Sequence, residues 1–375
     1  DASCDWSSDV CSSDLVKILK KFLSCLLILF CIVNITGCSN KEEETKTKIN
    51  NFEIKSATNV VESYMDFIMK EDFENGKKLY TKELYRKSAN LPISNMKIKG
   101  YKVTESNEVG KSGIFKVRVT KTSIGSSLSC MDEYSIKIVK DGAEYKIGEI
   151  TNTQQTEAFI EGTGIRYRDK SNVKTSLIID VSGIPKYAYS KNDGARLYKT
   201  MVPLKSFGPI NFSYEGDKIA FSTYNKNSFI GIVNIDESLE VQGNVDQSSQ
   251  GGESGGSGVM AKEKPIGKDL VPIDLLFNCK VEFMIFSTDE KFLLVQYNSE
   301  KNGKCIGVYK VENGDMIPIN FEKYYPIEKV QIIFSSFGED SMTYEVIPKS
   351  NGNGAEGNII GKWELSLKDF TVKKL

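Results

Sequence analysis

The sequence predicts two domains of different class, an α+β domain followed by an all-β domain of repeated strands. Apolar residues recur at three- and four-residue steps between Val60 and Ile68, which is the pattern of one helix face. After Pro92 the apolar period changes to two, as in strands that are buried on one face. From Thr175 onward there is no helical period, and one strand-turn-strand phrase recurs.

The most apolar stretch, Phe22–Val33, directly follows a basic patch that contains Lys17, Lys20 and Lys21. Its twelve residues would span about 18 Å as a helix, whereas a bilayer core requires about 30 Å. A basic start, a short apolar segment and small residues at its end are typical of a secretory signal. Residues 16–37 are therefore predicted to be a signal peptide.

The leader ends in Ile35, Thr36, Gly37 and Cys38, and this ending resembles a bacterial lipobox. The resemblance implies that Cys38 is lipidated on its thiol and becomes the first residue of the mature protein. It also implies an anchor on the outer face of the cytoplasmic membrane, and we expect a Gram-positive bacterium. The alternative is an ordinary transmembrane anchor, or a cleaved signal with a chance cysteine.

The segments on either side of the leader are predicted to lie outside the folded domains. Residues 1–15 lack a starting Met, place four aspartates ahead of the lysines, and resemble translated sequencing adapter. We therefore expect the native protein to begin near Val16. Residues 38–50 are charged and contain no aromatic side chain, so burial cannot offset the entropy of ordering them. They are predicted to form a disordered tether.

Composition excludes several classes of function. The chain has 49 Lys and Arg against 50 Asp and Glu, which leaves no positive surplus for nucleic acid. It has no His, so Ser–His and Cys–His nucleophile pairs and His-ligated metal sites are excluded. After Cys38 only Cys130, Cys279 and Cys305 remain, too few and too widely spaced for a disulfide framework or a zinc cluster. We expect buried thiols, with a Cys279–Cys305 bridge as the alternative, and no cofactor, metal or catalytic residue.

Residues 51–154 are predicted to fold as helices followed by an antiparallel meander. Asn59 and Glu62 have the spacing of a capping box at the start of the first helix. Apolar residues from Phe73 to Tyr85 suggest a second and a third short helix. Asp141-Gly142 then has the composition of a two-residue hairpin turn between two alternating strands.

Two stretches, VVESYMDFIMKEDFENGKKLYTKEL and EYSIKIVKDGAEYKIGEI, resemble the nuclear transport factor 2-like family. The resemblance implies a cone-like α+β domain in which helices pack into the concave face of a curved sheet. Enzymes of that family use a His or an Asp inside the cone. Asp66, Asp132 and Glu133 are the candidate acids here, although each is expected to be solvated.

Residues 155–174 are polar and are predicted to link this domain to the all-β domain at 175–375. A second polar segment, residues 240–264, contains QSSQGGESGGSG and is predicted to be a flexible insertion.

The all-β domain repeats one phrase, at 209–225, 281–298 and 330–346, with a weak fourth copy at 177–189. In each clear copy a strand ends in Phe-Ser and is followed by a polar turn and a second strand. The phrase resembles the WD-repeat-like blade motif of TolB-type β-propellers, which implies a small or incomplete propeller. The motif residues are expected to be structural, and they are Phe212, Ser213, Gly216, Phe286, Ser287, Phe334 and Ser335.

These observations predict an extracytoplasmic lipoprotein that binds or scaffolds a protein, a peptide or an envelope glycan without catalysis. The alternative is a small-ligand receptor, or a carboxylate-dependent enzyme, that uses a pocket of the 51–154 domain.

Overall fold

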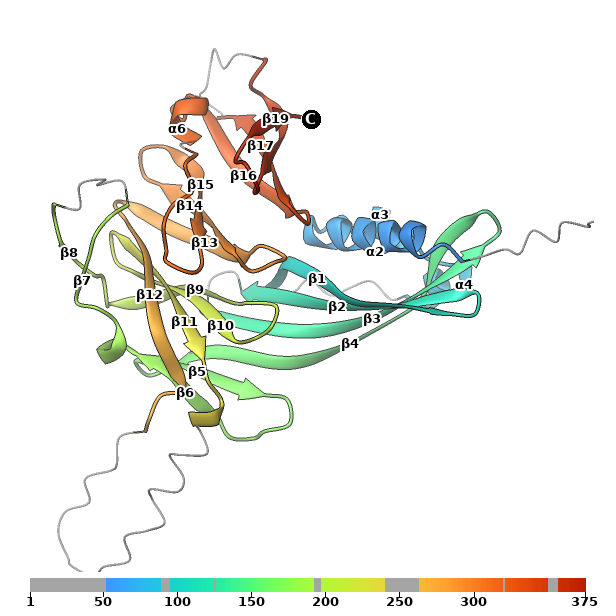
Figure 1. The fold of residues 1–375 in the computed structure, drawn as a ribbon, viewed down its shortest axis with the longest axis horizontal. Coiled ribbons are helices and arrows are strands. Elements are labelled where there is room, and N and C mark those ends of the chain that lie inside the picture. The colour runs from blue at the N-terminus through green and yellow to red at the C-terminus, as the bar shows by residue number, and fades with distance from the viewer. Residues whose placement is uncertain are drawn as a thin grey trace, which may run out of the picture. The chain divides into compact units, whose positions relative to one another are not determined.

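The computed structural model describes residues 52–88, 95–123, 126–191, 197–239, 263–319, 321–349 and 357–375 (Figure 1). Strands predominate in these ranges. Helices α2 (Ile54–Met69), α3 (Phe73–Lys77) and α4 (Lys82–Lys87) precede the first strand. Farther along lie a 3₁₀ turn, η1 (Val181–Gly183), and a short helix, α6 (Phe321–Tyr324).

The first sheet contains six antiparallel strands in chain order. They are β1 (Met96–Val109), β2 (Ser112–Ser123), β3 (Leu128–Asp141), β4 (Glu144–Glu161), β5 (Gly164–Asp169) and β6 (Ser176–Asp180). The predicted hairpin joins β3 to β4, but its two-residue loop is Gly142-Ala143, because Asp141 pairs with Glu144. Gly142 takes the positive φ of 63° at the first loop position.

This sheet corrects the predicted fold class, because residues 51–154 do not form a separate cone-like α+β domain. β4 runs 18 residues, through the expected domain end at position 154. The expected linker, residues 155–174, instead supplies the end of β4 and all of β5, which pair in the same sheet. The described chain is therefore mostly β, with several antiparallel sheets.

The polar composition of β4 explains why a linker is predicted here. Its middle, Thr151–Thr156, is polar throughout and looks like a linker in the sequence. An antiparallel strand can nevertheless expose one face to water, and Thr is a good strand former. Thr156 and Ala158 are buried and alternate with more exposed neighbours, as a one-sided strand requires.

Helix α2 covers one face of the first sheet with the predicted apolar period. Its buried residues are Ala57, Val61, Tyr64 and Met65. They pack against β2, β3 and β4, mainly through Phe115, Val117, Val119, Ile136, Ile138 and Ile147. The predicted capping box is wrong, because the helix begins five residues before Asn59, at Ile54, with Glu53 as its N-cap. These side chains fill the interface between the helix and the sheet.

Three further antiparallel sheets follow in chain order, beside a small β7–β8 hairpin (Tyr187–Ala188 and Thr200–Met201). The second sheet contains β9 (Ser206–Phe212), β10 (Lys218–Tyr224), β11 (Ser228–Ile235) and β12 (Gly267–Leu276). The third contains β13 (Cys279–Phe286), β14 (Phe292–Ser299) and β15 (Gly303–Lys310). The fourth contains β16 (Val330–Phe337), β17 (Ser341–Pro348), β18 (Gly361–Ser366) and β19 (Val372–Lys374).

The recurring sequence phrase falls on the first hairpin of each of these sheets, namely β9–β10, β13–β14 and β16–β17. The weak fourth copy, residues 177–189, does not form a hairpin. Its first part is β6 of the first sheet, and its last part is β7, which pairs with β8.

The first two phrases form the same turn. The Ser213 amide donates to the Lys218 carbonyl at 3.0 Å, and the Ser213 hydroxyl accepts from the Lys218 amide at 3.1 Å. Ser287 makes the equivalent bonds to Phe292, at 2.8 and 3.0 Å. Gly216 and Glu290 occupy the same turn position, with φ values of 78° and 59°.

The third phrase differs. The register shifts between Phe334 and Ser336, so Ser335 lies at a bulge inside β16. The strand continues to Phe337, and the turn closes where the Gly338 amide donates to the Ser341 carbonyl at 2.8 Å.

Buried residues also join the sheets to one another. Asn211 of β9 is 1% exposed and lies between the first and third sheets. Its amide nitrogen donates to the Met284 carbonyl of β13 at 2.8 Å, and its oxygen accepts from the Ser129 hydroxyl of β3 at 3.2 Å. This side chain therefore connects three sheets.

Several predicted features lie outside the described residues. They are the adapter-like segment 1–15, the signal peptide 16–37, the lipobox Ile35–Cys38, the tether 38–50 and most of the insertion at 240–264. Within the described ranges, no helix combines the length and the apolar character needed to span a bilayer.

Candidate functional site

A cavity of about 720 Å³ opens where the first sheet meets the second, third and fourth. The ends of β1 and β2 supply Lys99, Thr122 and Ser123 to its wall. The rest of the wall comes from β9, β10 and β11 of the second sheet, β13, β14 and β15 of the third, and β16 of the fourth. This volume lies in the range of small-molecule sites in proteins.

The charged groups of the cavity are mainly positive. Lys99, Lys280 and Lys304 line it, together with Glu282 as its acidic side chain. The Lys304 ammonium is paired with the Glu282 carboxylate at 3.1 Å. The lining therefore has a positive excess.

Most hydroxyl groups of the cavity are held by backbone carbonyls. The Ser206 hydroxyl donates to the Tyr224 carbonyl at 2.9 Å, and the Ser228 hydroxyl donates to the Cys279 carbonyl at 2.8 Å. The Ser222 hydroxyl donates to the Pro209 carbonyl at 3.2 Å. Two of these bonds join β9 to β10 and the third joins β11 to β13, and none of them activates an oxygen as a nucleophile.

Lys99 is half-buried on β1, and its ammonium lies 4.8 Å from the centre of the Phe283 ring. Burial lowers the pKa of Lys99 below its ordinary value. The carboxylates of Glu71 and Glu282 oppose this shift of the pKa, while the ammonium groups of Lys97 and Lys304 add to it.

A second hollow of about 370 Å³ adjoins the first, and the two share Lys99, Phe283, Ile333 and Phe334 in their walls. Met69 and Lys70, at the end of α2, line its other side. Lys99 and Phe283 therefore belong to the wall between two hollows, which makes them central to this region of the molecule.

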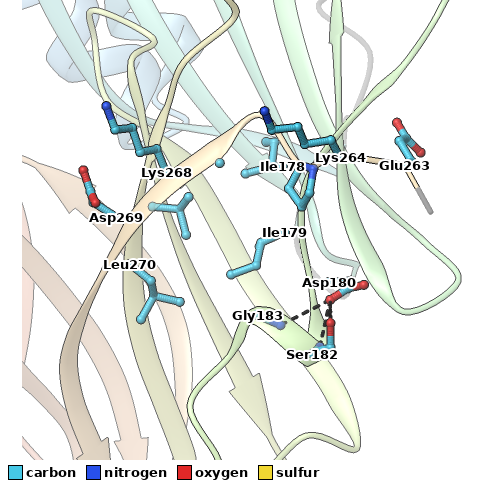
Figure 2. A pocket seen from close by; sticks show the side chains of 13 residues that line it. Ile178, Ile179, Asp180, Ser182, Gly183, Glu263, Lys264, Lys268, Asp269 and Leu270 are labelled. Carbon is cyan, nitrogen blue, oxygen red and sulfur yellow. Dashed lines mark hydrogen bonds between the residues drawn. The ribbon is translucent and has the colours of Figure 1, made fainter. Parts of the chain in front are cut away.

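A separate pocket of about 450 Å³ lies between β6 and the start of β12, and Figure 2 shows the side chains that line it. Asp180, Ser182 and Gly183 line it, and the Asp180 carboxylate accepts hydrogen bonds from the amides of Ser182 and Gly183 at 2.8 and 3.2 Å. Lys264 and Lys268 also line this pocket.

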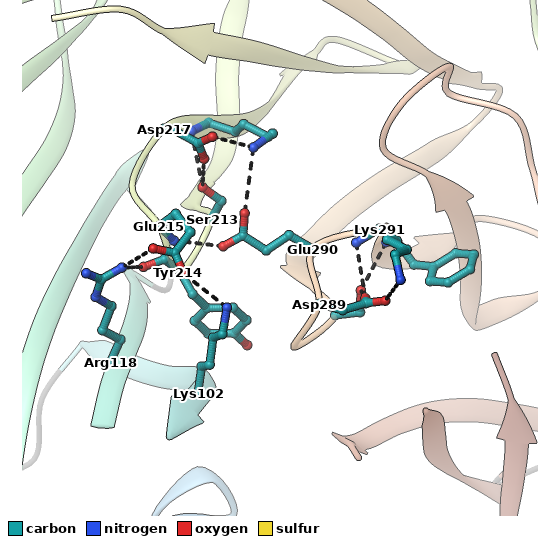
Figure 3. A network of polar contacts seen from close by, with 12 residues as sticks. Lys102, Arg118, Ser213, Tyr214, Glu215, Asp217, Asp289, Glu290 and Lys291 are labelled. Atoms are coloured by element: carbon teal, nitrogen blue, oxygen red, sulfur yellow. Dashed lines mark hydrogen bonds and ion pairs between the residues drawn. The ribbon is translucent and has the colours of Figure 1, made fainter. Parts of the chain in front are cut away.

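A polar network joins the first two repeat turns to the first sheet (Figure 3). The Glu215 carboxylate contacts Lys102 of β1 at 3.0 Å and Arg118 of β2 at 2.8 Å. The Glu215 amide donates to the Glu290 carboxylate at 2.7 Å. Glu290 therefore accepts a hydrogen bond from the first repeat turn and also adopts a positive φ in its own turn.

The candidate acids of the sequence analysis do not meet in one site. The Asp66 carboxylate accepts from the Tyr101 hydroxyl at 3.3 Å, and burial raises its pKa. Asp132 is 1% exposed, pairs with Lys121 and accepts from the Asn152 amide at 3.3 Å. Glu133 lies on β3 and is half-buried. The cavity lining contains none of the three.

The cysteines of the described chain are buried, as predicted. Cys130, Cys279 and Cys305 all carry buried thiols. Burial raises the pKa of Cys130 to about 11, so its thiolate is scarce at neutral pH. Within the described ranges, no group of three or more potential ligands could hold a metal ion.

The motif residues of the repeats lie in turns and in the core. Phe212 and Phe286 are each 1% exposed, and Phe334 also belongs to the wall of the cavity. Sequence reasoning missed Lys99, Lys280 and Lys304. The alternation Lys97-Ile98-Lys99 on a strand was visible, but no local pattern showed that Lys99 faces three other sheets.

No protein-family model matches the chain, and no curated protein sequence matches it either. Weak structural neighbours include a Bacteroides fragilis protein described as a 6-phosphogluconolactonase, at a TM-score of 0.24 and 11% identity, which covers 59% of this chain and 69% of that one. Another is a puromycin-hydrolyzing peptidase of Mycobacterium tuberculosis, at a TM-score of 0.20 and 9% identity, with 73% of this chain and 52% of that one covered.

A third neighbour is the β-propeller domain of Myceliophteria thermophila Cps50 (Swd1), at a TM-score of 0.24 and 8% identity. The match covers 67% of this chain and 97% of that domain. The neighbours thus include a β-propeller domain and two proteins named as enzymes, and the chain spans about half the length of the peptidase. Scores this low carry no argument about the activity of this chain.

Proposed function

We propose that this protein is a lipid-anchored, extracytoplasmic binding protein that holds a ligand in the cavity between its sheets. The ligand is a small molecule or a short segment of an envelope component, and binding involves no chemical change. The observation that carries the proposal is the cavity itself, at about 720 Å³ and lined by strands of all four large sheets.

The lining supports recognition more than catalysis. Its ammonium groups, aromatic rings and amides can orient a ligand, as in other small-molecule sites. The hydroxyls of Ser206, Ser222 and Ser228 already donate to carbonyls, and no acid–base pair of the described lining activates them.

The proposed location, on the outer face of the membrane, rests on the sequence. The segment Phe22–Val33 has the length of a signal peptide core, and Ile35–Cys38 resembles a lipobox. Labelled palmitate should therefore attach to the natural protein and not to Cys38→Ala, which should be released or mislocated. Undiminished labelling of Cys38→Ala would refute the anchor.

The binding site can be tested with the full chain, purified from membranes in detergent. Melting temperatures are measured with sugars, sugar phosphates, uronic acids, amino acids and short peptides. A true ligand raises the melting temperature by several degrees at concentrations well above its Kd.

The matched variants are Asn298→Trp and Asn107→Trp. Asn298 is an exposed strand residue that lines the cavity, whereas Asn107 is exposed on β1 and does not line it. We expect Asn298→Trp to abolish the ligand-induced rise and Asn107→Trp to retain it. If both variants keep the ligand-induced rise in melting temperature, the ligand binds elsewhere.

A further inference from the structure

We propose that the ligand of the cavity is an anionic sugar, whose carboxylate or phosphate group is bound by Lys99 and Lys280. This inference rests on the proposed function, because it names the class of ligand that the same cavity binds.

The first observation is the position of Lys99 among the lysines of β1. Lys97 is paired with Glu71, and Lys102 is paired with Glu215 at 3.0 Å. Lys99 lies between them in the sequence, yet within the described ranges it has no carboxylate within ion-pair distance. Its ammonium faces the Phe283 ring, which compensates only part of the cost of burying a charge.

The second observation is the balance of charge around Lys99. Glu282 is the acid of the cavity lining, and its carboxylate is engaged with Lys304. Lys280, on the same strand as Glu282, contacts the ring of Tyr224 at 5.8 Å and has no carboxylate within ion-pair distance in the described chain. Two ammonium groups of the cavity are therefore available to an anion.

The third observation is the character of the remaining wall. Aromatic rings from three sheets line it, namely Phe207, Tyr224, Phe283 and Phe334. Side-chain amides and strand backbone lie between the rings. A ligand that fits must present both a charged group and a body with a flat, partly apolar face. Carboxylated and phosphorylated sugars satisfy both conditions.

The burial of Lys99 supports the same assignment. Burial disfavours its charged form, as the lowered pKa indicates. A bound anion supplies the missing negative charge and forms a charge-assisted hydrogen bond, which is stronger than a neutral one. Lys99 thus acts in binding at a cost to the stability of the empty protein.

The experiment is titration calorimetry of the full chain in detergent with glucuronate, glucose 6-phosphate and glucose. We expect at least one anion to bind and glucose to bind at least about tenfold more weakly. The two anions distinguish a carboxylate site from a phosphate site.

Three matched variants each remove one positive charge. Lys99→Met should weaken anion binding about tenfold or more, and Lys280→Met by a smaller factor. Lys111→Met, at an exposed turn that does not line the cavity, should bind like the natural protein. The melting temperature of Lys99→Met without ligand should equal or exceed that of the natural protein, which separates lost binding from lost folding.

Equal binding of glucose and the anions, or equal affinities of Lys99→Met and Lys111→Met, would overturn the inference. If a neutral sugar or peptide binds and Asn298→Trp blocks it, the anionic class is wrong and the cavity remains the site. If no compound of either panel binds, the cavity is not a small-ligand site and both proposals fail.

Discussion

The Arg118 guanidinium of β2 lies 2.8 Å from the Glu215 carboxylate in the turn between β9 and β10. The same guanidinium donates to the Tyr214 carbonyl at 2.7 Å. The turn of the first repeat is therefore bound to the first sheet through both a side chain and its backbone. Because the Glu215 amide also donates to Glu290, the second repeat turn belongs to the same network.

Arg118→Ala is expected to lower the free energy of unfolding by about 1 kcal/mol. Arg118 is 30% exposed and Glu215 is 52% exposed, so solvent screening limits the contribution of the ion pair. Urea unfolding measures the loss. Lys116→Ala, which breaks the more exposed Lys116–Glu105 pair, should cost less, and an equal cost would contradict the role of the network.

The Arg118–Glu215 pair should also make the stability of the protein depend on pH. Hydrogen bonds from Lys102 and Arg118 lower the pKa of Glu215 below its unfolded value. This contribution is fully present above the unfolded pKa and is lost as pH falls through the folded pKa. The cost of Arg118→Ala should therefore be smaller near pH 3 than at pH 7, and a constant cost would exclude the linkage.

Gly216→Ala is expected to destabilise the protein by about 1 kcal/mol. Gly216 has a φ of 78°, and an added Cβ would lie 3.0 Å from the Met131 side chain. Gly76→Ala is the control, since Gly76 lies in α3 and its added Cβ would meet only ordinary contacts at 3.5 Å or more. Urea unfolding of both variants measures the difference in their free energies of unfolding. A Gly216→Ala protein as stable as Gly76→Ala would contradict the turn geometry.

Asn211→Ala is expected to cost about 2 kcal/mol, because it removes two buried hydrogen bonds between sheets. It leaves the Met284 carbonyl without its Asn211 donor and the Ser129 hydroxyl without its Asn211 acceptor. Asn107→Ala, at an exposed position, should change stability by less than about 0.5 kcal/mol. Urea unfolding of both variants gives the comparison, and similar values would show that the bridge contributes little.

The partial burial of Lys99 should give a second dependence of stability on pH. Here the shifted pKa destabilises the folded protein, whereas the shifted pKa of Glu215 stabilises it. The folded pKa of Lys99 is lowered from 10.5, so between the folded and unfolded values the unfolded chain binds more protons. Stability should rise with pH through this window. Glu71, Lys97, Glu282 and Lys304 act on the same ammonium, and each is retained in Lys99→Met. The stability advantage of Lys99→Met over the natural protein should therefore shrink from pH 7 to pH 10. An advantage independent of pH would contradict the buried charge.

Local patterns predicted the parts of the fold that local physics determines. The apolar face of α2, the β3–β4 hairpin and the hairpins of the three repeats all follow from period and turn composition. The start of α2 could not be predicted in this way. Phe52 is 6% exposed and packs edge-on against Tyr145 at 5.1 Å, so a contact distant in sequence determines where the helix begins.

The parts that depend on distant strands were not predicted. The polar middle of β4 forms a strand because β3 and β5 pair with it, and neither pairing is visible in its own composition. The cavity has the same origin, since Lys99 and Phe283 are 184 positions apart in the printed sequence. In the sequence, Lys99 cannot be distinguished from an ordinary surface lysine, because its surroundings come from four different sheets.

The central claim, that the cavity binds a ligand outside the cytoplasm, is tested most directly by photo-cross-linking in intact cells. p-Benzoylphenylalanine is incorporated at position 298, which lines the cavity, and in a separate strain at position 107, which does not. Mass spectrometry of the irradiated protein should show a covalent adduct of a small molecule or envelope fragment at 298 and none at 107. The same adduct at both positions, or at 107 alone, would contradict the account.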